Sequence, residues 1–388
     1  MDGLTPFHEE IRAKTRDVAR NVTAKFAARH DTDYSVPMET MQALHQNGVL
    51  DICIDRELGG QGTGMLNGVD PLAYLLVIEE LGRADMSAAH CFQIEAHTCQ
   101  LFTAAGSEEQ KQRYLGPAKE RGALFSWTGS EPGRTARGQY NLISDAKRKN
   151  GGYVLNGTKN FATLANVADW NVIAVTVADM PSPENFLLVA VPRDATGFLV
   201  DEAWWRPTGM RGAVSPKLEL KNIEVPDRDV IQGPGFYPKS QYGARLHLGF
   251  AANHLGAAQG LLDFAIEYLP KRGTVNNPHS QRVIGEMCMQ IEAARQMIYT
   301  AARLWDGQAR EGAAEYALMA KLFAISMAEW MVDETIRIVG STALLEQYPV
   351  NRFVRDIHVH STHANLHNTA QAIGRGTLKM TFDATAQQ

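Results

Sequence analysis

Four of the twelve histidines in this 388-residue chain lie close together near its C-terminal end. They are His358, His360, His363 and His367. Imidazole exchanges protons near neutral pH, so such a cluster suits proton transfer or the holding of a polar intermediate. A helix over residues 351–374 would bring His360, His363 and His367 to one face, because side chains three and four positions apart are neighbours. The spacing predicts a reactive imidazole at His363 with a second imidazole one turn to either side.

A zinc site is another interpretation of this spacing, because imidazole is a common zinc ligand. No acidic residue follows these histidines before Asp383, and we expect no bound metal. His358 falls off the shared face, which predicts a solvent-facing or structural role. A purely structural cluster is the alternative for the other three histidines.

Composition limits the class of protein. With 45% hydrophobic and 21% charged residues the chain can bury a large core, and its length favours two or three domains. A net charge of -5 argues against nucleic acid as a partner, because that interaction needs a concentrated basic surface. The most apolar run, residues 246–266, contains several polar side chains and predicts a buried helix, so we expect no membrane association.

The cysteines and the first residues indicate a reducing compartment. Cys53, Cys91, Cys99 and Cys288 include no Cys-x-x-Cys pair, which predicts buried free thiols. The N-terminal residues show no basic stretch followed by an apolar run, as a secretory signal would. We expect a cytoplasmic protein.

Three segments of different periodicity predict an α+β protein. Residues 1–122 and 234–388 have helical patterns, whereas residues 123–233 contain strand-like runs separated by turn residues. Asn150-Gly151-Gly152 predicts a hairpin turn, and Ser107 predicts a capping box that opens a helix. The expected architecture is an N-terminal helical domain, a middle β-barrel or sandwich domain and a C-terminal antiparallel four-helix bundle.

Two motifs of the β segment carry a family resemblance. They are Trp127-Thr128-Gly129-Ser130-Glu131-Pro132-Gly133 and Gly157-Thr158-Lys159-Asn160-Phe161-Ala162-Thr163. Alone, each would be a strand and a turn. Together they resemble the aromatic-x-x-Thr-Glu-Pro-Gly and Asn-Gly-x-Lys-x-Trp-Ile-Thr motifs of acyl-CoA dehydrogenases, and Thr208-Gly209-Met210-Arg211-Gly212 resembles that family's Gly-Met-Arg segment. The resemblance covers nearly the whole chain.

This resemblance implies a flavin cofactor. In the family the first motif presents main-chain NH groups and a hydroxyl to the pyrimidine edge of the flavin, which implies that Trp127, Gly129 and Ser130 bind it. The second motif places an aromatic side chain against the isoalloxazine and a hydroxyl near its N5 atom, which implies these roles for Phe161 and Thr163.

The C-terminal histidines occupy the place of the family's catalytic base. Residues 346–356 resemble the family's C-terminal signature, after which a Tyr-Glu-Gly-Thr sequence supplies a glutamate. This chain has His363-Ala364-Asn365-Leu366 there. Removal of an α-proton from an acyl thioester needs a carboxylate, which alanine cannot replace. Other family members carry the glutamate near positions 244–248, yet no acid lies between Asp229 and Asp263.

The pair His360-x-x-His363 resembles instead the reduced-flavin-dependent monooxygenase branch of the superfamily, which includes dibenzothiophene monooxygenases. There Arg-x-x-x-x-His-x-x-His-Asp-Pro occupies this place, although here Ala364-Asn365 replaces Asp-Pro. The resemblance implies catalysis by His363 and cofactor binding by His360. The favoured function is a two-component monooxygenase that oxygenates a small aromatic, sulfur or nitrogen compound through a flavin C4a-hydroperoxide, with reduced flavin supplied by a separate flavin reductase.

The segments that bind the adenosine diphosphate half of FAD in the family are less well matched in this chain. Arg272 and Gln281 resemble the residues that contact the adenosine diphosphate half of FAD on a neighbouring subunit, but the interval between them is shortened. Gly340 lies in Val339-Gly340-Ser341, which replaces the family's Gly-Gly-x-Gly. The cofactor is therefore expected to be FMN or FAD, and the shared site implies a homotetramer.

Substrate contacts are the least specified part of the sequence. His97, on an expected helix in the domain that lines the family's cleft, and Arg134, in a loop near its entrance, are candidate substrate-binding residues, with core and solvent-facing roles as alternatives. Trp204 and Trp205 could either wall the flavin or plug the β domain.

Two other functions stay open. One is an acyl-CoA or acyl-carrier-protein dehydrogenase, or a desulfinase-like enzyme, with a displaced or missing base. The other is a scaffold without catalytic activity. Retention of Trp127, Ser130, Phe161 and Thr163 argues against the scaffold, because a structural relic has no need of hydroxyls that face a flavin.

Overall fold

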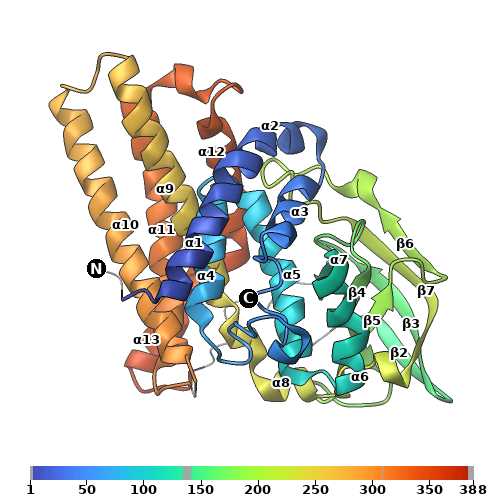
Figure 1. Cartoon of the computed structure of the whole chain (residues 1–388). Helices are drawn as coiled ribbons and strands as arrows, with labels where there is room; N and C mark the ends of the chain where they lie inside the picture. The colour runs from blue at the N-terminus through green and yellow to red at the C-terminus, as the bar shows by residue number, and fades with distance from the viewer. Residues whose placement is uncertain (1–2, 134–139, 141, 308, 383–388) are drawn as a thin grey trace.

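The computed structural model describes residues 3–133, 140, 142–307 and 309–382. Figure 1 shows long C-terminal helices on one side of the molecule, a curled sheet on the other side, and N-terminal helices between and in front of them. The expected α+β architecture, with its helical, β and helical segments, is confirmed.

The N-terminal segment is a group of helices. They are α1 (Pro6–Val18), the π-helical turn η1 (Ala19–Thr23), α2 (Ala24–Asp33), α3 (Met38–Gln46), α4 (Pro71–Gly82) and α5 (Met86–Ala105). Asp70 and Asp85 cap α4 and α5 by accepting main-chain N–H groups of the first turn. Every residue of α4 is buried, and Ile94 is the one residue of the central part of α5 with intermediate exposure. A helix buried on all sides belongs to the core of the fold, so polar side chains of α5 must find partners inside the protein.

A capping box begins the next helical stretch, as the sequence predicts. The Ser107 hydroxyl accepts the N–H of Gln110 at 3.2 Å, and the Gln110 side chain accepts the N–H of Ser107 at 3.1 Å. The stretch comprises α6 (Glu108–Gln110), the π-helical turn η3 (Lys111–Leu115) and α7 (Gly116–Arg121).

A seven-stranded sheet forms the middle of the described chain. Its strands are β1 (Phe125–Thr128), β2 (Asp145–Lys149), β3 (Gly152–Lys159), β4 (Trp170–Val177), β5 (Phe186–Pro192), β6 (Phe198–Asp201) and β7 (Lys217–Pro226). The order is β1-β4-β2-β3-β7-β6, with β5 on the other edge of β4. β1 and β2 run parallel to successive stretches of β4, and the remaining pairs are antiparallel. The predicted β2–β3 hairpin is present, with Gly151 at a positive φ of 77°.

The C-terminal segment forms a helical bundle. Its helices are α8 (Phe236–Ser240), α9 (His247–Lys271), α10 (Pro278–Trp305), α11 (Ala313–Val339), α12 (Pro349–Ser361) and α13 (Leu366–Thr377). The chain also contains the 3-10 turns η2 (Arg56–Leu58), η5 (Glu202–Trp204), η6 (Asp227–Asp229), η7 (Tyr242–Arg245), η8 (Ser341–Leu344) and η9 (Thr362–Ala364). The three long helices α9, α10 and α11 pack against one another, and α12 packs on α9 beside α5.

The prediction of one helix over residues 351–374 was wrong. α12 ends at Ser361, and Asn365 adopts a left-handed conformation with a φ of 35°. Asparagine tolerates this conformation because its short side chain forms local hydrogen bonds, and here it accepts the N–H of Asn368 at 3.1 Å to start α13. The break falls within the histidine cluster and changes the direction of its side chains.

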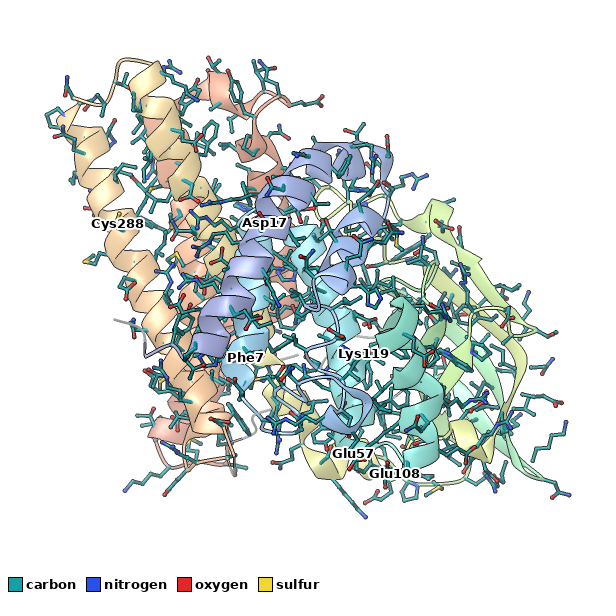
Figure 2. All side chains as sticks on the ribbon, viewed as in Figure 1. Phe7, Asp17, Glu57, Glu108, Lys119 and Cys288 are labelled. Atoms are coloured by element: carbon teal, nitrogen blue, oxygen red, sulfur yellow. The ribbon has the colours of Figure 1, made fainter. Side chains whose placement is uncertain are left out.

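The prediction of four buried thiols was wrong for one of them. Cys53, Cys91 and Cys99 are buried, whereas Cys288 is exposed on α10, at the outer edge of the bundle in Figure 2. Across the described residues, no helix combines the length and apolar character that crossing a membrane requires.

A buried ion pair joins the two motifs of the β segment. The Lys159 ammonium lies 2.8 Å from a Glu131 oxygen, with both side chains at most 1% exposed. The Glu131 carboxylate also accepts the N–H groups of Ile143 and Ser144, at 2.5 and 2.9 Å. This arrangement fixes the loop after β1 against the end of β3.

Replacing Lys159 by Met should lower the free energy of unfolding by about 3–5 kcal/mol, because Glu131 would keep a buried charge without its cation. Urea unfolding followed by tryptophan fluorescence measures the loss. Lys149→Met is the matched control: Lys149 pairs with Glu224 at the exposed end of the same sheet, so its loss should cost only about 0–1 kcal/mol. Similar losses in both variants would contradict a special role for the buried pair.

Candidate functional site

Histidines from four different elements meet in the interior. His90 belongs to α5, His254 to α9, His360 to α12 and His363 to η9. The ring centroids of His360 lie 5.2 Å from His90, 4.9 Å from His254 and 5.5 Å from His363. The Phe250 ring stacks 5.9 Å from that of His363 and lies 5.3 Å from His360. The fold therefore brings His360 and His363 together, as predicted, and adds two imidazoles that are remote in sequence.

A chain of hydrogen bonds leads from this cluster to the β segment. The His360 Nε2 and His90 Nδ1 atoms are 3.3 Å apart, and His90 Nε2 lies 3.3 Å from the Thr163 hydroxyl oxygen. The Thr163 hydroxyl lies 2.8 Å from that of Ser215, which donates to the carbonyl of Ala213 at 2.7 Å. One continuous chain thus connects helices of the N- and C-terminal segments with Thr163.

Burial keeps the inner imidazoles neutral. Burial, together with the nearby His363, lowers the pKa of His90 to about 3, and burial lowers that of His254 to about 4 against two main-chain hydrogen bonds that raise it. The pKa of His360 falls well below 6.5, first through burial and then through the neighbouring histidines. An uncharged imidazole has one donor and one acceptor nitrogen, which is what a directed hydrogen-bond chain requires.

His363 differs from the inner rings because it borders open space. Its ring packs against His90 and Phe250, yet the residue as a whole is exposed. Burial and the Lys321 ammonium both lower the pKa of His363, and water on its open side weakens the effect of burial. Lys321 is itself buried, and burial lowers its pKa to about 7. His363 is therefore the member of the cluster that can meet a substrate or cofactor.

The predicted flanking position of His367 was wrong. Because the helix breaks at Asn365, His367 lies on α13 and is exposed, away from the shared face. His358 is also exposed, as the sequence indicates. His360 and His363 remain neighbours because both precede the break at Asn365.

The two motifs of the β segment are joined by a main-chain hydrogen bond. The N–H of Asn160 donates to the carbonyl of Ser130 at 3.1 Å. Trp127 is half-buried, with its ring 4.8 Å from His97 and 5.2 Å from Tyr237. Ser130 is exposed, and a side chain added at Gly129 would meet only Ala174, at 3.9 Å. This edge could accept a planar ligand beside free main chain.

Phe161 stands beside this edge in an unusual conformation. It has a positive φ of 52°, and the residue is 48% exposed. Trp204, 38% exposed, meets it edge-on at 5.1 Å, whereas Trp205 is buried and donates its indole N–H to the carbonyl of Arg211 at 3.0 Å. The two tryptophans therefore have different places: Trp205 fills the interior, and Trp204 lies at the surface next to Phe161.

The predicted dinucleotide residues gather elsewhere. Arg272 donates to the carbonyl of Val339 at 2.8 Å, and a side chain added at Gly340 would lie 3.2 Å from its guanidinium. Gln281 is exposed and donates to the carbonyl of Val275 at 3.2 Å. Arg272 is the C-cap residue of α9 and Gln281 lies in the first turn of α10, and in Figure 1 the connection between these helices lies at the far end of the bundle, away from the sheet. Arg272 and Gly340 are brought to one another, whereas Gln281 contacts Val275 instead.

Of the two candidate substrate residues, the structure places one. His97 lies on α5, 3% exposed, with no hydrogen-bond partner for either ring nitrogen among the described residues. Arg134 lies outside the described residues.

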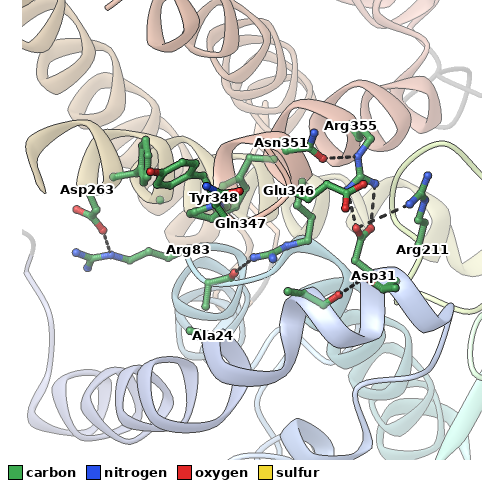
Figure 3. A pocket seen from close by; sticks show the side chains of 18 of the residues that line it. Ala24, Asp31, Arg83, Arg211, Asp263, Glu346, Gln347, Tyr348, Asn351 and Arg355 are labelled. Atoms are coloured by element: carbon green, nitrogen blue, oxygen red, sulfur yellow. Dashed lines mark hydrogen bonds and ion pairs between the residues drawn. The ribbon is translucent and has the colours of Figure 1, made fainter. Parts of the chain in front are cut away.

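A cavity of about 610 Å³ lies between α2, α9 and the start of α12 (Figure 3). Its cations are engaged: Arg355 and Arg211 face Asp31, and Arg83 pairs with Asp263. The cavity lies at the opposite end of α12 from His363, so we assign it no part in the chemistry.

Sequence reasoning assigned no part in the site to His90, His254, Lys321 and Ser215. Each lies far from the C-terminal motif in the sequence, and only the packing of α5, α9 and α11 around α12 brings them together. No local signal singled out His90, because the same helix also buries other polar residues, such as Gln93 and Glu95. Despite the four imidazoles, no group of three metal-ligating side chains in the described part of the chain could hold an ion.

Family models match three consecutive parts of this chain. They are the acyl-CoA dehydrogenase N-terminal domain over residues 5–120, the middle domain over 127–223 and the C-terminal domain over 248–368. The chain belongs to the acyl-CoA dehydrogenase family. The middle-domain match includes both motifs of the β segment, and the C-terminal match includes His360 and His363.

Similarity over nearly the whole chain extends to a sequence relative and to solved structures of the same fold. A probable acyl-CoA dehydrogenase, YngJ of Bacillus subtilis, is 30% identical over 91% of this chain and 93% of its own length. Butyryl-CoA dehydrogenase of Megasphaera elsdenii has a TM-score of 0.87 at 23% identity, over 97% of this chain and 100% of its own. The FMN-bound structure of TdsC from Paenibacillus sp. A11-2 has a TM-score of 0.86 at 20% identity, over 97% and 98%.

Membership of the acyl-CoA dehydrogenase family indicates a flavin-dependent oxidoreductase. The residues fit such a cofactor: an exposed aromatic face at Phe161, free main chain at Gly129 and an unpartnered ring nitrogen of His97 lie around the same edge of the sheet. Where flavin is bound, it would be held there by Trp127, Ser130 and Phe161.

The buried imidazoles should make stability fall with acid. Their folded-state pKa values lie below the ordinary value near 6.5, so the unfolded chain binds more protons as the pH falls below it, and stability is lost towards pH 3–4. His90→Gln should flatten the slope of unfolding free energy against pH, by up to about 1.4 kcal/mol per pH unit below about pH 6.5. Denaturant unfolding at a series of pH values measures it. The exposed His358→Gln variant is the control, and equal slopes in the two variants would contradict the assignment.

Proposed function

We propose that the chain is a two-component flavin-dependent monooxygenase. A separate reductase supplies reduced flavin, dioxygen is the second substrate, and the third is a small aromatic, sulfur or nitrogen compound. One oxygen atom enters that compound, the other leaves as water, and the flavin leaves oxidised. The enzyme is expected in the cytoplasm, where reduced flavin is supplied.

The observation that carries this proposal is the arrangement around His363. A family dehydrogenase requires a carboxylate next to the substrate, but the groups that act on His363 are the neutral rings of His90 and His360, the Phe250 ring and the Lys321 ammonium. A cation lowers the basicity of an imidazole and stabilises negative charge near it. This environment is better suited to stabilising dioxygen during its reduction than to abstracting a weakly acidic α-proton.

The residues of the chain would divide the work as follows. Phe161 and Trp204 flank the flavin ring, and the edge at Gly129 and Ser130 donates main-chain hydrogen bonds to it. Flavin, once reduced, supplies the electrons that activate dioxygen. His363 holds or delivers a proton at the ring nitrogen on its open side, and His360 and His90 fix the position of that ring. The buried aromatic and imidazole rings behind them exclude water.

Replacing His363 by Ala should reduce incorporation of isotopically labelled dioxygen into product by about 10²–10⁴-fold, the usual contribution of a positioned acid or base. The assay mixes anaerobically reduced FMN, the enzyme and a panel of small aromatic, sulfur and nitrogen compounds with labelled dioxygen. FMN affinity should change little. His367→Ala, an exposed histidine just beyond the helix break, should match the wild type. Full incorporation by the His363 variant would contradict the proposed role.

Oxidation of an acyl thioester is the second candidate, favoured by the similarity of the whole chain to YngJ, a probable acyl-CoA dehydrogenase. It predicts that an acyl-CoA bleaches the oxidised flavin in the absence of dioxygen. Bleaching without incorporation of labelled oxygen into any compound of the panel would replace the monooxygenase proposal with this one.

The remote group around Arg272 and Gly340 is proposed to complete the flavin site of a neighbouring copy in a homotetramer. Arg272→Ala should then weaken binding of FAD by about tenfold or more, because a charge-assisted hydrogen bond to phosphate is lost, and should leave FMN affinity nearly unchanged. Equilibrium binding of both flavins measures this, with Lys271→Ala on the adjacent exposed position as control. Unchanged FAD affinity would exclude this group from the site and favour FMN.

A further inference from the structure

We propose that Ser215 and His360 fix the direction of the hydrogen-bond chain through Thr163, so that the Thr163 hydroxyl can only accept a hydrogen bond from the flavin. The proposal rests on the proposed function and on the place beside the flavin N5 atom that the family resemblance implies for Thr163. It adds a reason why the site selects one redox state of the cofactor.

The direction is set at the Ser215 end. Ser215 uses its single hydroxyl hydrogen on the carbonyl of Ala213, which can only accept. At 2.8 Å, the Thr163 and Ser215 oxygens require a hydrogen between them, and only Thr163 can supply it. The Thr163 hydrogen is thereby committed to Ser215, so the contact between Thr163 and His90 must be a bond donated by His90 Nε2.

The other end of the chain agrees with this direction. If His90 carries its hydrogen on Nε2, its Nδ1 is an acceptor and His360 Nε2 must be the donor across 3.3 Å. The remaining His360 nitrogen, Nδ1, then carries a lone pair and no hydrogen, and it has no partner among the described residues. The reverse direction would place an N–H there, fully buried and unsatisfied, and would leave a hydrogen missing either between Thr163 and Ser215 at 2.8 Å or between Ser215 and the Ala213 carbonyl at 2.7 Å. Both consequences are unfavourable.

An acceptor at Thr163 distinguishes the two forms of flavin. Oxidised flavin presents a lone pair at N5, which would face the oxygen lone pair of Thr163. Reduction adds two electrons and places a proton on N5, which then donates to Thr163. The neutral state of His90 and His360 preserves this direction, because a doubly protonated ring would have no acceptor nitrogen. Thr163 therefore favours reduced flavin, the form that the proposed reaction consumes.

The experiment compares the Kd of oxidised FMN with that of anaerobically reduced FMN for the whole enzyme. The wild type should bind reduced FMN more tightly. Thr163→Val should raise the Kd of reduced FMN by about tenfold, the effect of one hydrogen bond, and change that of oxidised FMN little. Ser215→Ala should instead lower the Kd of oxidised FMN, because the released Thr163 hydrogen can turn to N5. A tenfold increase in the Kd of reduced FMN relative to that of oxidised FMN lowers the midpoint potential of bound FMN by about 30 mV.

Ser240→Ala is the matched control, because Ser240 likewise donates to a main-chain carbonyl, that of Tyr237, at 2.8 Å. It should leave both constants unchanged. A purely structural Ser215 would raise both constants together and leave the potential where it was, which would overturn the inference. Equal affinity of the wild type for the two redox states would also overturn it, while the labelled-dioxygen assay still decides the proposed function. Failure to bind either FMN or FAD in both redox states would remove both.

Discussion

The enclosure of α5 is the constraint on which the site depends. Most of its side chains are buried, and His90 is only 6% exposed. A buried polar group without a partner costs roughly 1–3 kcal/mol, so the fold is more stable where polar side chains of this helix find partners inside the protein. For His90 those partners are His360 of α12 and Thr163 of the β segment. A requirement of burial thus connects the N-terminal, middle and C-terminal parts at one point.

The family signature is used here mainly for packing. Asp356 accepts the N–H of Met210 at 2.5 Å, and Arg355 donates to the carbonyl of Thr208 at 3.0 Å. At Gly209 a side chain would lie 2.3 Å from the carbonyl oxygen of Arg355, so only glycine allows this approach. These contacts hold the segment that precedes Ser215 against α12. The signature can therefore be present in a chain that has His363-Ala364-Asn365-Leu366 after it, because its contacts serve the positions of other residues.

The sequence predicts features that depend on neighbouring residues. The capping box at Ser107, the hairpin at Gly151 and the β-segment motifs are of this kind, and the first two are confirmed. The helix over residues 351–374 was predicted from apolar periodicity, which overlooked Asn365 as an N-cap. Partners across long sequence separations, such as His90 with His360, follow from tertiary packing, which no local pattern specifies. The domain boundaries and the individual site residues stay predictions, and Arg134 cannot be placed.

The separation of Arg272 and Gly340 from the edge that carries Phe161 has a consequence for how the protein holds its cofactor. If one copy supplies the ring site and another the phosphate contacts, cofactor affinity and subunit association become linked equilibria. Association of two copies then strengthens flavin binding, and flavin binding strengthens association. The occupancy of the flavin site depends on the concentration of the protein as well as on that of the flavin. Dilution would release flavin, and added flavin would hold the assembly together.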